Sequence, residues 1–161
     1  MQWEKITDIS LITSLIVLFV FAGLGAYQWF TRKSFKKVDR PLLAMLIPLV
    51  LMAIVYIVFD KLIVLNTRPN GSGESSFPST HTMIVATIFF MVMIVLPRYV
   101  KSKFLRVLLD FVMLMLISLT AAGRVFANMH YITDVIGGLG FAIFFAIIYY
   151  FLTKEEDTTD E

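Results

Sequence analysis

The stretch KLIVLNTRPNGSGESSFPSTH, residues 61–81, separates two long apolar runs and carries cations, hydroxyl groups and a histidine. A second polar stretch, GRVFANMHYITD, residues 123–134, separates two further apolar runs. The chain has two histidines, His81 and His130, and each stretch contains one of them. We therefore expect the fold to bring the two stretches together into one site.

The composition is that of a membrane protein. Of the 161 residues, 58% are hydrophobic and 16% are charged, whereas soluble domains are about 45–50% apolar and about 25% charged. The charges cluster and leave windows of roughly 18 residues that are almost free of them, which is typical of membrane-spanning helices. The net charge of +2 is too small to indicate a surface that binds nucleic acid. The lack of cysteine excludes disulfides and thiolate metal sites.

Five apolar runs are long enough to cross a bilayer, which takes about 20 helical residues. They must be helices, because an isolated strand in lipid would leave its backbone groups unpaired. We predict an all-α integral membrane protein: a bundle of about five transmembrane helices in a single domain, residues 1–161, that ends in an acidic tail at 153–161. The predicted spans are Ile9–Phe30, Pro41–Leu65, Pro78–Leu96, Phe104–Ala122 and Ile132–Leu152.

Lysine and arginine are distributed unequally between the two sides of the predicted bundle. The loop TRKSFKKVDR after the first span has five of them, and the loop between the third and fourth spans has three. These loops share one side, which the positive-inside rule predicts to be cytoplasmic. The stretches 61–81 and 123–134 share the other side. We therefore predict an extracytoplasmic site in the cell membrane, an N-terminus outside and a cytoplasmic C-terminus.

Lys61 and Arg68 are the two cations of the first stretch. They lie seven residues apart, about two helical turns, and would point the same way if the second helix continued. Pro69 disfavours helical geometry at Arg68, so we expect the helix to end near that residue. The pair is either a clamp for an anion such as phosphate or a pair of anchors at the membrane interface.

The sequence PSTH, residues 78–81, is typical of a helix start, because a proline and a hydroxyl residue suit the first turn. A helix N-terminus offers free N–H groups and a positive dipole end, which bind phosphate. Ser79 and the Thr80 backbone amide could thus contact an oxyanion, with His81 beside them. The alternative is an ordinary capped helix with an incidental histidine.

In the second stretch, Arg124 is followed by His130 and then, four residues later, by Asp134. At this spacing on a helix, the aspartate can accept a hydrogen bond from one imidazole nitrogen and leave the other free as a nucleophile. The alternative is a structural pair that caps the fifth helix. The three cations on this side, Lys61, Arg68 and Arg124, would attract an anion and repel a metal ion, so we predict neither a metal nor a cofactor.

Together, these motifs resemble the signature of the type 2 phosphatidic acid phosphatase (lipid phosphate phosphatase) superfamily. That signature has a lysine, six residues and Arg-Pro, then Pro-Ser-Gly-His, then Ser-Arg, five residues, histidine, three residues and aspartate. This chain has KLIVLNTRP at 61–69, PSTH at 78–81 and GRVFANMHYITD at 123–134, in the same order and with the same internal spacings. The resemblance covers roughly residues 55–150, the predicted catalytic core.

The chain departs from the family pattern in three ways. Thr80 replaces the usual glycine, and Gly123 replaces the usual serine, which removes one hydroxyl contact to phosphate. The family's membrane members usually have six helices, and the deficit here lies at the N-terminus. We expect these departures from the family pattern to leave the catalytic core intact.

The resemblance implies a metal-independent hydrolase of phosphomonoesters or diphosphates. His130 would attack phosphorus and form a phosphohistidine, Asp134 would orient it, and His81 would be the general acid. The other candidates would hold the phosphate oxygens: Lys61, Arg68, Ser79, the amide of Thr80, and Arg124.

The membrane setting favours a lipid phosphate as the substrate. Small chains of this family commonly act on undecaprenyl diphosphate, and an outward-facing site suits that carrier; phosphatidylglycerophosphate and phosphatidic acid are the rivals. A second class is a lipid-phosphate binder or translocator without turnover, but binding alone needs cations and not a pair of histidines with Asp134. A third class is a channel or transporter, but the spans lack the mid-membrane charges that transport sites often need. No oligomeric state is predicted.

Overall fold

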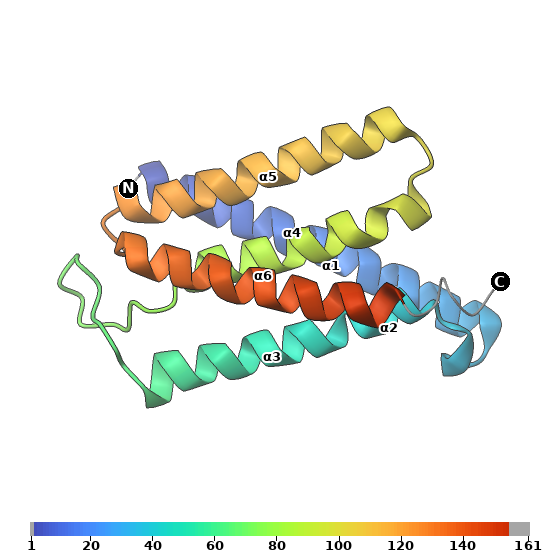
Figure 1. Cartoon of the computed structure of the whole chain (residues 1–161), viewed down its shortest axis with the longest axis horizontal. Coiled ribbons are helices and arrows are strands. Elements are labelled where there is room, and N and C mark those ends of the chain that lie inside the picture. Colours follow the sequence, from blue (N-terminus) through green and yellow to red (C-terminus); the bar gives the residue numbers. More distant parts are fainter. Residues whose placement is uncertain (1, 155–161) are drawn as a thin grey trace.

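The computed structural model describes residues 2–154, which form a bundle of long helices (Figure 1). Six α-helices and two short helical segments, η1 and η2, follow one another along this part of the chain. Their bounds are α1 Gln2–Arg32, η1 Phe35–Lys37, α2 Arg40–Ala44, α3 Leu46–Ile57, η2 Val58–Leu62, α4 Thr80–Tyr99, α5 Lys103–Phe126 and α6 Ile132–Lys154. The described residues contain no β-strand, so the predicted all-α class is confirmed.

Within residues 2–154, five segments are long and apolar enough to cross a membrane, which confirms the predicted number of spans. One of them, Arg40–Leu62, consists of α2, α3 and η2, and the other four are single helices. The predicted bounds of the last four spans agree with the structure to within four residues. The predicted acidic tail at 153–161 lies outside the described residues, apart from the last two residues of α6.

The first span differs, because α1 begins at Gln2, seven residues before the predicted start at Ile9. Apolar character marks the part of a helix that lies in hydrocarbon, and not the end of its hydrogen-bonded backbone. With 31 residues, α1 is longer than the ~20 residues that a bilayer crossing needs. Its first two turns reach the end of the bundle where α4 begins (Figure 1).

α4 is the central helix of the bundle. It packs against α1, α3, α5 and α6, and most of its apolar side chains are buried, including Met83 and Phe89. Met113 and Ile117 from α5 complete the apolar cluster around it. Because α4 is surrounded by four other helices, its first residues are held in place at one end of the bundle.

α1 packs on α4 and α5 through small polar side chains and turns large apolar ones outward. Thr7, Ser10 and Ser14 are buried, whereas Ile9 and Phe19 are exposed. This pattern suits a bilayer, where small residues let helices approach closely and apolar side chains meet lipid. The hydroxyls of Ser10 and Ser14 donate to carbonyls of α1 itself, so neither is left unpaired.

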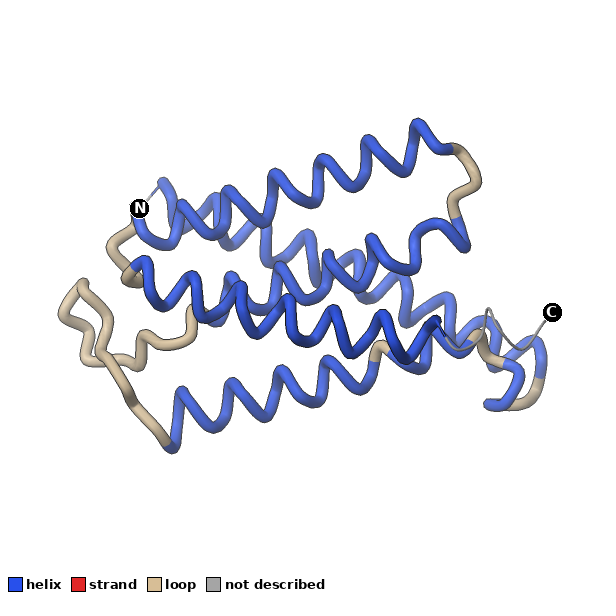
Figure 2. The backbone as a smooth tube through the Cα atoms, viewed as in Figure 1, coloured by secondary structure: helices blue, strands red, loops and turns tan. Residues whose placement is uncertain are grey.

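The two polar stretches of the sequence lie at one end of the bundle. The loop of residues 63–79 and the turn of residues 127–131 meet there, beside the start of α1 (Figure 2). At the opposite end, Asp39 accepts hydrogen bonds from three side chains, Gln28, Arg32 and Tyr99. The antiparallel order of the helices therefore separates the polar stretches from the basic loop between α1 and α2.

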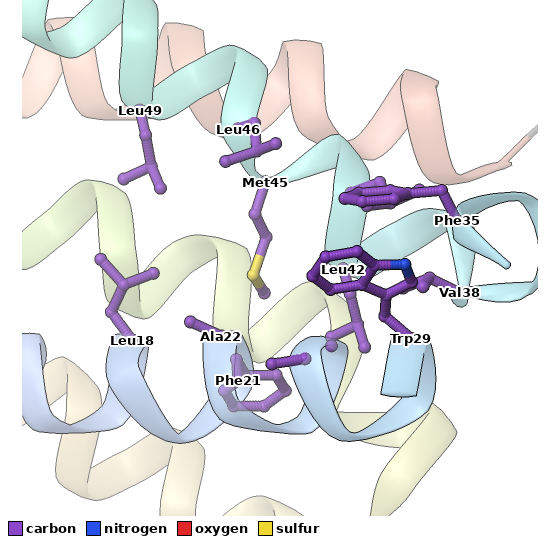
Figure 3. Close-up of a pocket in the computed structure, with 13 residues that line it drawn as sticks. Leu18, Phe21, Ala22, Trp29, Phe35, Val38, Leu42, Met45, Leu46 and Leu49 are labelled. Carbon is purple, nitrogen blue, oxygen red and sulfur yellow. The ribbon is translucent and has the colours of Figure 1, made fainter. Parts of the chain in front are cut away.

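An apolar cavity of ≈ 260 Å³ lies between α1 and α2–α3, toward this basic end (Figure 3). Its walls include Leu18 and Trp29 from α1, Phe35 from η1, and Leu42 and Leu49. All of its lining residues are apolar: aliphatic or aromatic side chains, Met45, and glycine and alanine. The cavity therefore offers no group that could bind a phosphate or move a proton.

Candidate active site

His130 lies in the turn between α5 and α6 and is held by the backbone of the loop 63–79. Its Nδ1 atom is 2.8 Å from the carbonyl oxygen of Ser76. A carbonyl can only accept, so Nδ1 carries the proton and Nε2 keeps its lone pair. The Nε2 atom is buried and has no hydrogen-bond partner in the described part of the chain. The site therefore presents one imidazole nitrogen as an available nucleophile.

Asp134 is linked to His130 through Ser76 and not by a direct hydrogen bond. His130 Nδ1 and Asp134 Oδ2 are 3.9 Å apart, too far for a hydrogen bond. Ser76 Oγ instead donates to Asp134 Oδ2 at 2.5 Å, and the Tyr131 amide donates to the same oxygen at 2.9 Å. The predicted direct contact is wrong because α6 begins at Ile132, so His130 precedes the helix and the i,i+4 geometry does not apply.

The pKa of His130 is lowered from 6.5 to about 4, mainly by burial and then by the positive charge of Arg124. Arg68 adds to this effect, whereas the hydrogen bond to Ser76 and the charge of Asp134 oppose it. At neutral pH the imidazole is therefore neutral. This is the form in which Nε2 can attack an electrophile.

Arg124 occupies the last turn of α5 and has only 3% of its surface exposed. Its Nη1 atom donates to Thr7 Oγ1 at 3.4 Å, and its Nε atom has no hydrogen-bond partner among the described residues. A buried guanidinium with an unsatisfied N–H group is costly unless an anion binds to it. Arg124 therefore marks a place for an anion close to His130.

Gly123 allows α1 to approach Arg124. A Cβ atom at residue 123 would lie 2.6 Å from Thr7 Cγ2, which is closer than real side chains pack. The glycine in place of the serine expected from the resemblance thus makes room for α1. The hydroxyl of Thr7 lies against the guanidinium instead.

Ser79 and Thr80 form the start of α4, as the sequence predicts, with Ser79 as the N-cap residue. The Ser79 amide donates to the carbonyl of Asp134 at 2.9 Å, and its hydroxyl pairs with Thr82 Oγ1 at 2.9 Å. A Cβ atom at Gly138 would lie 2.8 Å from the Ser79 carbonyl oxygen, so this contact between α4 and α6 requires glycine. Ser79 therefore joins two helices, while the Thr80 amide belongs to a first helical turn, whose N–H groups lack intrahelical acceptors.

His81 is the second residue of α4 and lies where α1 meets that helix. Its Nε2 atom is 3.2 Å from Asp8 Oδ1 of α1. Arg124 and Arg68 act electrostatically on both His81 and His130. The fold thus brings together both histidines and two of the three predicted cations.

Arg68 reaches the site from the loop 63–79. Its Nη1 atom pairs with Glu74 Oε2 at 2.7 Å, and its amide donates to the Glu74 carbonyl at 3.0 Å. Gly71 lies between these two residues with a φ of 77°, a conformation that glycine adopts without strain. Nη1 also lies 4.0 Å from Met129 Sδ in the α5–α6 turn. Arg68 is therefore placed at the edge of the site by a tight turn of its own loop.

Lys61 makes its ion pair with a residue that does not belong to the site. The chain is π-helical over Val58–Leu62 and then leaves the helix, so the predicted two-turn alignment of Lys61 with Arg68 is wrong. Lys61 Nζ instead pairs with Asp60 Oδ2 at 2.7 Å, and its side chain is 67% exposed. Within residues 2–154, no hydrogen bond or ion pair joins Lys61 to Arg68 or to a histidine.

Three residues that contact the candidate site were not predicted from the sequence: Thr7, Asp8 and Ser76. Ser76 lies in a loop rich in serine, and nothing in the sequence distinguishes it from its neighbours. Thr7 and Asp8 occupy the first turns of α1, directly ahead of the apolar part of that helix. Those polar residues were the signal that could have identified the role of α1.

A cavity of ≈ 640 Å³ lies beside His130, between the loop 63–79 and the α5–α6 turn. Asn66 and Thr67 line it from the loop, and Tyr131 lines it from the turn. His130 lines this cavity as well, whereas Arg124, Arg68 and His81 do not. The described residues contain no group of three or more His, Asp or Glu side chains arranged to hold a metal ion.

The fold and the site together define a helical membrane protein in which an unpaired imidazole nitrogen of His130 and a buried, partly unsatisfied guanidinium of Arg124 lie in one polar site. A family model of the PAP2 superfamily matches residues 60–157, which is more than half of the chain. This chain belongs to the PAP2 superfamily. The match includes both polar stretches, and it confirms the family predicted from the motifs.

A crystal structure of a transmembrane PAP2-type phosphatidylglycerolphosphate phosphatase from Bacillus subtilis has a similar fold, with a TM-score of 0.66. The two chains are 22% identical, and the match covers 99% of this chain and 76% of the other. No curated protein sequence matches this chain. The protein is accordingly a multi-pass membrane phosphatase that acts on lipid phosphates.

Proposed function

We propose that this protein hydrolyses a lipid phosphate or diphosphate through a phosphohistidine formed on His130. One observation carries the proposal: the Nδ1–H bond to the Ser76 carbonyl leaves Nε2 unprotonated, and the charge of the buried Arg124, whose Nε is unsatisfied, acts on the same ring. A neutral nucleophile beside a guanidinium is suited to attack on phosphorus, with the arginine stabilising the charge on the phosphate oxygens.

In the first step, His130 Nε2 forms a bond to phosphorus while the bond from phosphorus to the leaving oxygen breaks. His81 gives its proton to that oxygen, a role typically worth about 10²–10⁴-fold in rate. The positive charge that develops on the His130 ring is stabilised by Asp134, whose Oδ2 atom is 3.9 Å from Nδ1 and is oriented by Ser76. The oxygens of the reacting phosphate are held by Arg124, Ser79 and the amide of Thr80, while Lys61 and Arg68 help capture the headgroup from the more exposed edge.

In the second step, a water molecule attacks phosphorus and the bond to His130 Nε2 breaks. His81, which lost its proton in the first step, takes a proton from the water. Inorganic phosphate then leaves, and both histidines have returned to their starting states. The cycle needs no metal ion and no cofactor, because positioning and charge stabilisation supply most of the catalysis of phosphoryl transfer.

Undecaprenyl diphosphate is the proposed substrate. The basic loops lie at the end of the bundle opposite the site, which supports an extracytoplasmic site, an outside N-terminus and a cytoplasmic C-terminus. An outward-facing site suits hydrolysis of a lipid carrier that is released on that side. Arg68, at the edge of the site, would meet the second phosphoryl group of a diphosphate.

Phosphatidylglycerophosphate is a second candidate substrate. The structurally similar Bacillus subtilis protein is a phosphatidylglycerolphosphate phosphatase, and this favours the same headgroup here. Phosphatidic acid is a third. All three lipids present a phosphoryl group at headgroup level to the same histidine, so relative rates must choose between them.

The experiment is phosphate release by the purified protein in detergent with EDTA present, using each of the three lipids in turn. We expect release from at least one lipid, no effect of EDTA, and background rates in His130→Ala. Ile136→Ala is the matched control, because it truncates a side chain of α6 close to the site that is 62% exposed, and leaves the imidazole in place. The ranking of rates identifies the substrate.

Three outcomes would overturn parts of the proposal. Undiminished release by His130→Ala would exclude the phosphohistidine, and loss of activity in EDTA would exclude the metal-free mechanism. A folded protein that binds phosphate but releases none from any lipid would be a lipid-phosphate binder or translocator.

A further inference from the structure

The first two turns of α1 form a wall of the site that neither polar stretch provides. Asp8 Oδ1 lies 3.2 Å from His81 Nε2, and Thr7 Oγ1 lies 3.4 Å from Arg124 Nη1. Thr7 is completely buried, and its hydroxyl donates to the Glu4 carbonyl at 2.8 Å. Adjacent residues of one helix thus contact two groups that the proposed reaction uses.

We propose that Asp8 is a positioning residue for His81, holding Nε2 toward α1 and leaving Nδ1 as the atom that gives and takes the proton. This inference rests on the proposed function, in which His81 is the general acid. A carboxylate can only accept a hydrogen bond, so Nε2 carries the hydrogen in this contact. The other nitrogen is then free for proton transfer, and the charge of Asp8 stabilises the protonated ring.

The carboxylate of Asp8 allows His81 to be protonated in spite of the cations around it. Three charged groups act on His81 from the surrounding elements: Asp8 from α1, Arg124 from α5 and Arg68 from the loop 63–79. A general acid must hold a proton before it can give one, and two nearby arginines oppose a positively charged imidazole. Asp8 offsets them, so a site that attracts phosphate can still contain a protonated histidine.

The contact lies at an accessible edge of the bundle. The side chain of Asp8 is 54% exposed and that of His81 is 24% exposed. A side chain as exposed as that of Asp8 contributes little to packing, so its substitution should leave the fold intact. An effect on catalysis would then report the interaction with His81.

The first test compares Asp8→Asn, Asp8→Glu and the wild type in phosphate release as a function of pH. We expect Asp8→Asn to lower kcat about tenfold with little change in KM, and to move the alkaline limb of the profile about one unit toward lower pH. Asp8→Glu should restore part of the rate, because it returns the charge. Asp110→Asn, the same substitution in α5, should behave as the wild type and is the matched control.

The second test does not depend on turnover. In His130→Ala, His81 is the only histidine of the chain, so 15N-labelled histidine reports its tautomer and titration directly. We expect the Nε2–H tautomer, and a titration midpoint that falls by about one unit when Asp8→Asn is added. Phosphate binding to this background shows that the site is still formed.

The two tests separate the two claims. If the wild type releases no phosphate from any lipid, the proposed function fails, and the titration of His81 alone then decides whether Asp8 acts on it. If Asp8→Asn leaves both the tautomer and the midpoint unchanged, the positioning role of Asp8 is wrong even in an active enzyme.

Discussion

The candidate site has two halves that differ in burial. In the inner half no residue exposes more than 3% of its surface; its members are Ser76, Arg124, His130 and Asp134. In the outer half the exposed fraction of the side chain is 67% for Lys61, 23% for Arg68 and 61% for Glu74. The inner arginine has an N–H group without a partner, whereas both outer cations already pair with carboxylates.

This difference indicates which half supplies catalysis. A buried and unsatisfied donor gains a full hydrogen bond when an anion arrives, and it acts where water does not compete. An exposed cation exchanges one carboxylate partner for the substrate and is screened by salt, so its net gain is small. We therefore expect the inner half to stabilise the transition state and the outer half to help capture the lipid headgroup.

The largest contrast is expected between the two arginines. Arg124→Ala should lower kcat/KM by about 10²–10³-fold, because it removes a preorganised donor from a buried site. Arg68→Ala should lower it by only about tenfold, because that guanidinium is partly exposed and already paired. Initial rates of phosphate release measure both. Equal losses of kcat/KM in the two variants would contradict the difference that burial indicates. Both variants should have the unfolding temperature of the wild type, which shows that neither loss comes from misfolding.

The inner half should also keep its nucleophile neutral to unusually low pH. With its pKa at about 4, His130 has an unprotonated Nε2 above that pH, and it gains a proton and loses its nucleophilic lone pair below it. In a His81→Gln background, 15N-labelled histidine reports His130 alone. We expect a titration midpoint near 4, and a midpoint at the ordinary value of 6.5 would contradict the burial and cationic surroundings of this ring.

The sequence predicts the meeting of the two stretches better than it predicts their contacts. Five apolar runs alternate in direction, so loops after the second and fourth spans must share one side, and this needs no side-chain detail. The bond between His130 and Ser76 joins residues 54 apart in sequence through an irregular loop, where no helical or strand period applies. The start of α1 was missed for another reason: polar residues near a helix end carry no hydropathy signal, although the backbone there is helical.

A smaller effect is expected from Ser76→Ala. The Ser76 carbonyl would still accept from His130 Nδ1, but Asp134 Oδ2 would lose its hydroxyl partner. One hydrogen bond to a charged group is worth about 1.5–3 kcal/mol, or roughly 10- to 150-fold in rate. We expect kcat to fall by about tenfold, the lower end of this range, because the Tyr131 amide still donates to Asp134 Oδ2. Ser72→Ala, in the exposed part of the same loop, is the matched control and should change kcat less than twofold. A wild-type rate in Ser76→Ala would mean that Asp134 acts on His130 without the hydroxyl.

The smallest effect is expected from Lys61→Ala, which tests the limit of the comparison. Its ammonium group is exposed and paired with Asp60, so its removal should raise KM about threefold, leave kcat unchanged, and matter less at high salt. Lys61→Arg, which keeps the charge, is the control and should resemble the wild type. A loss of 100-fold or more in kcat would mean that Lys61 moves onto the phosphate when the lipid binds. The outer half would then belong to the catalytic machinery, and the exposed fraction of a side chain would not separate headgroup capture from catalysis.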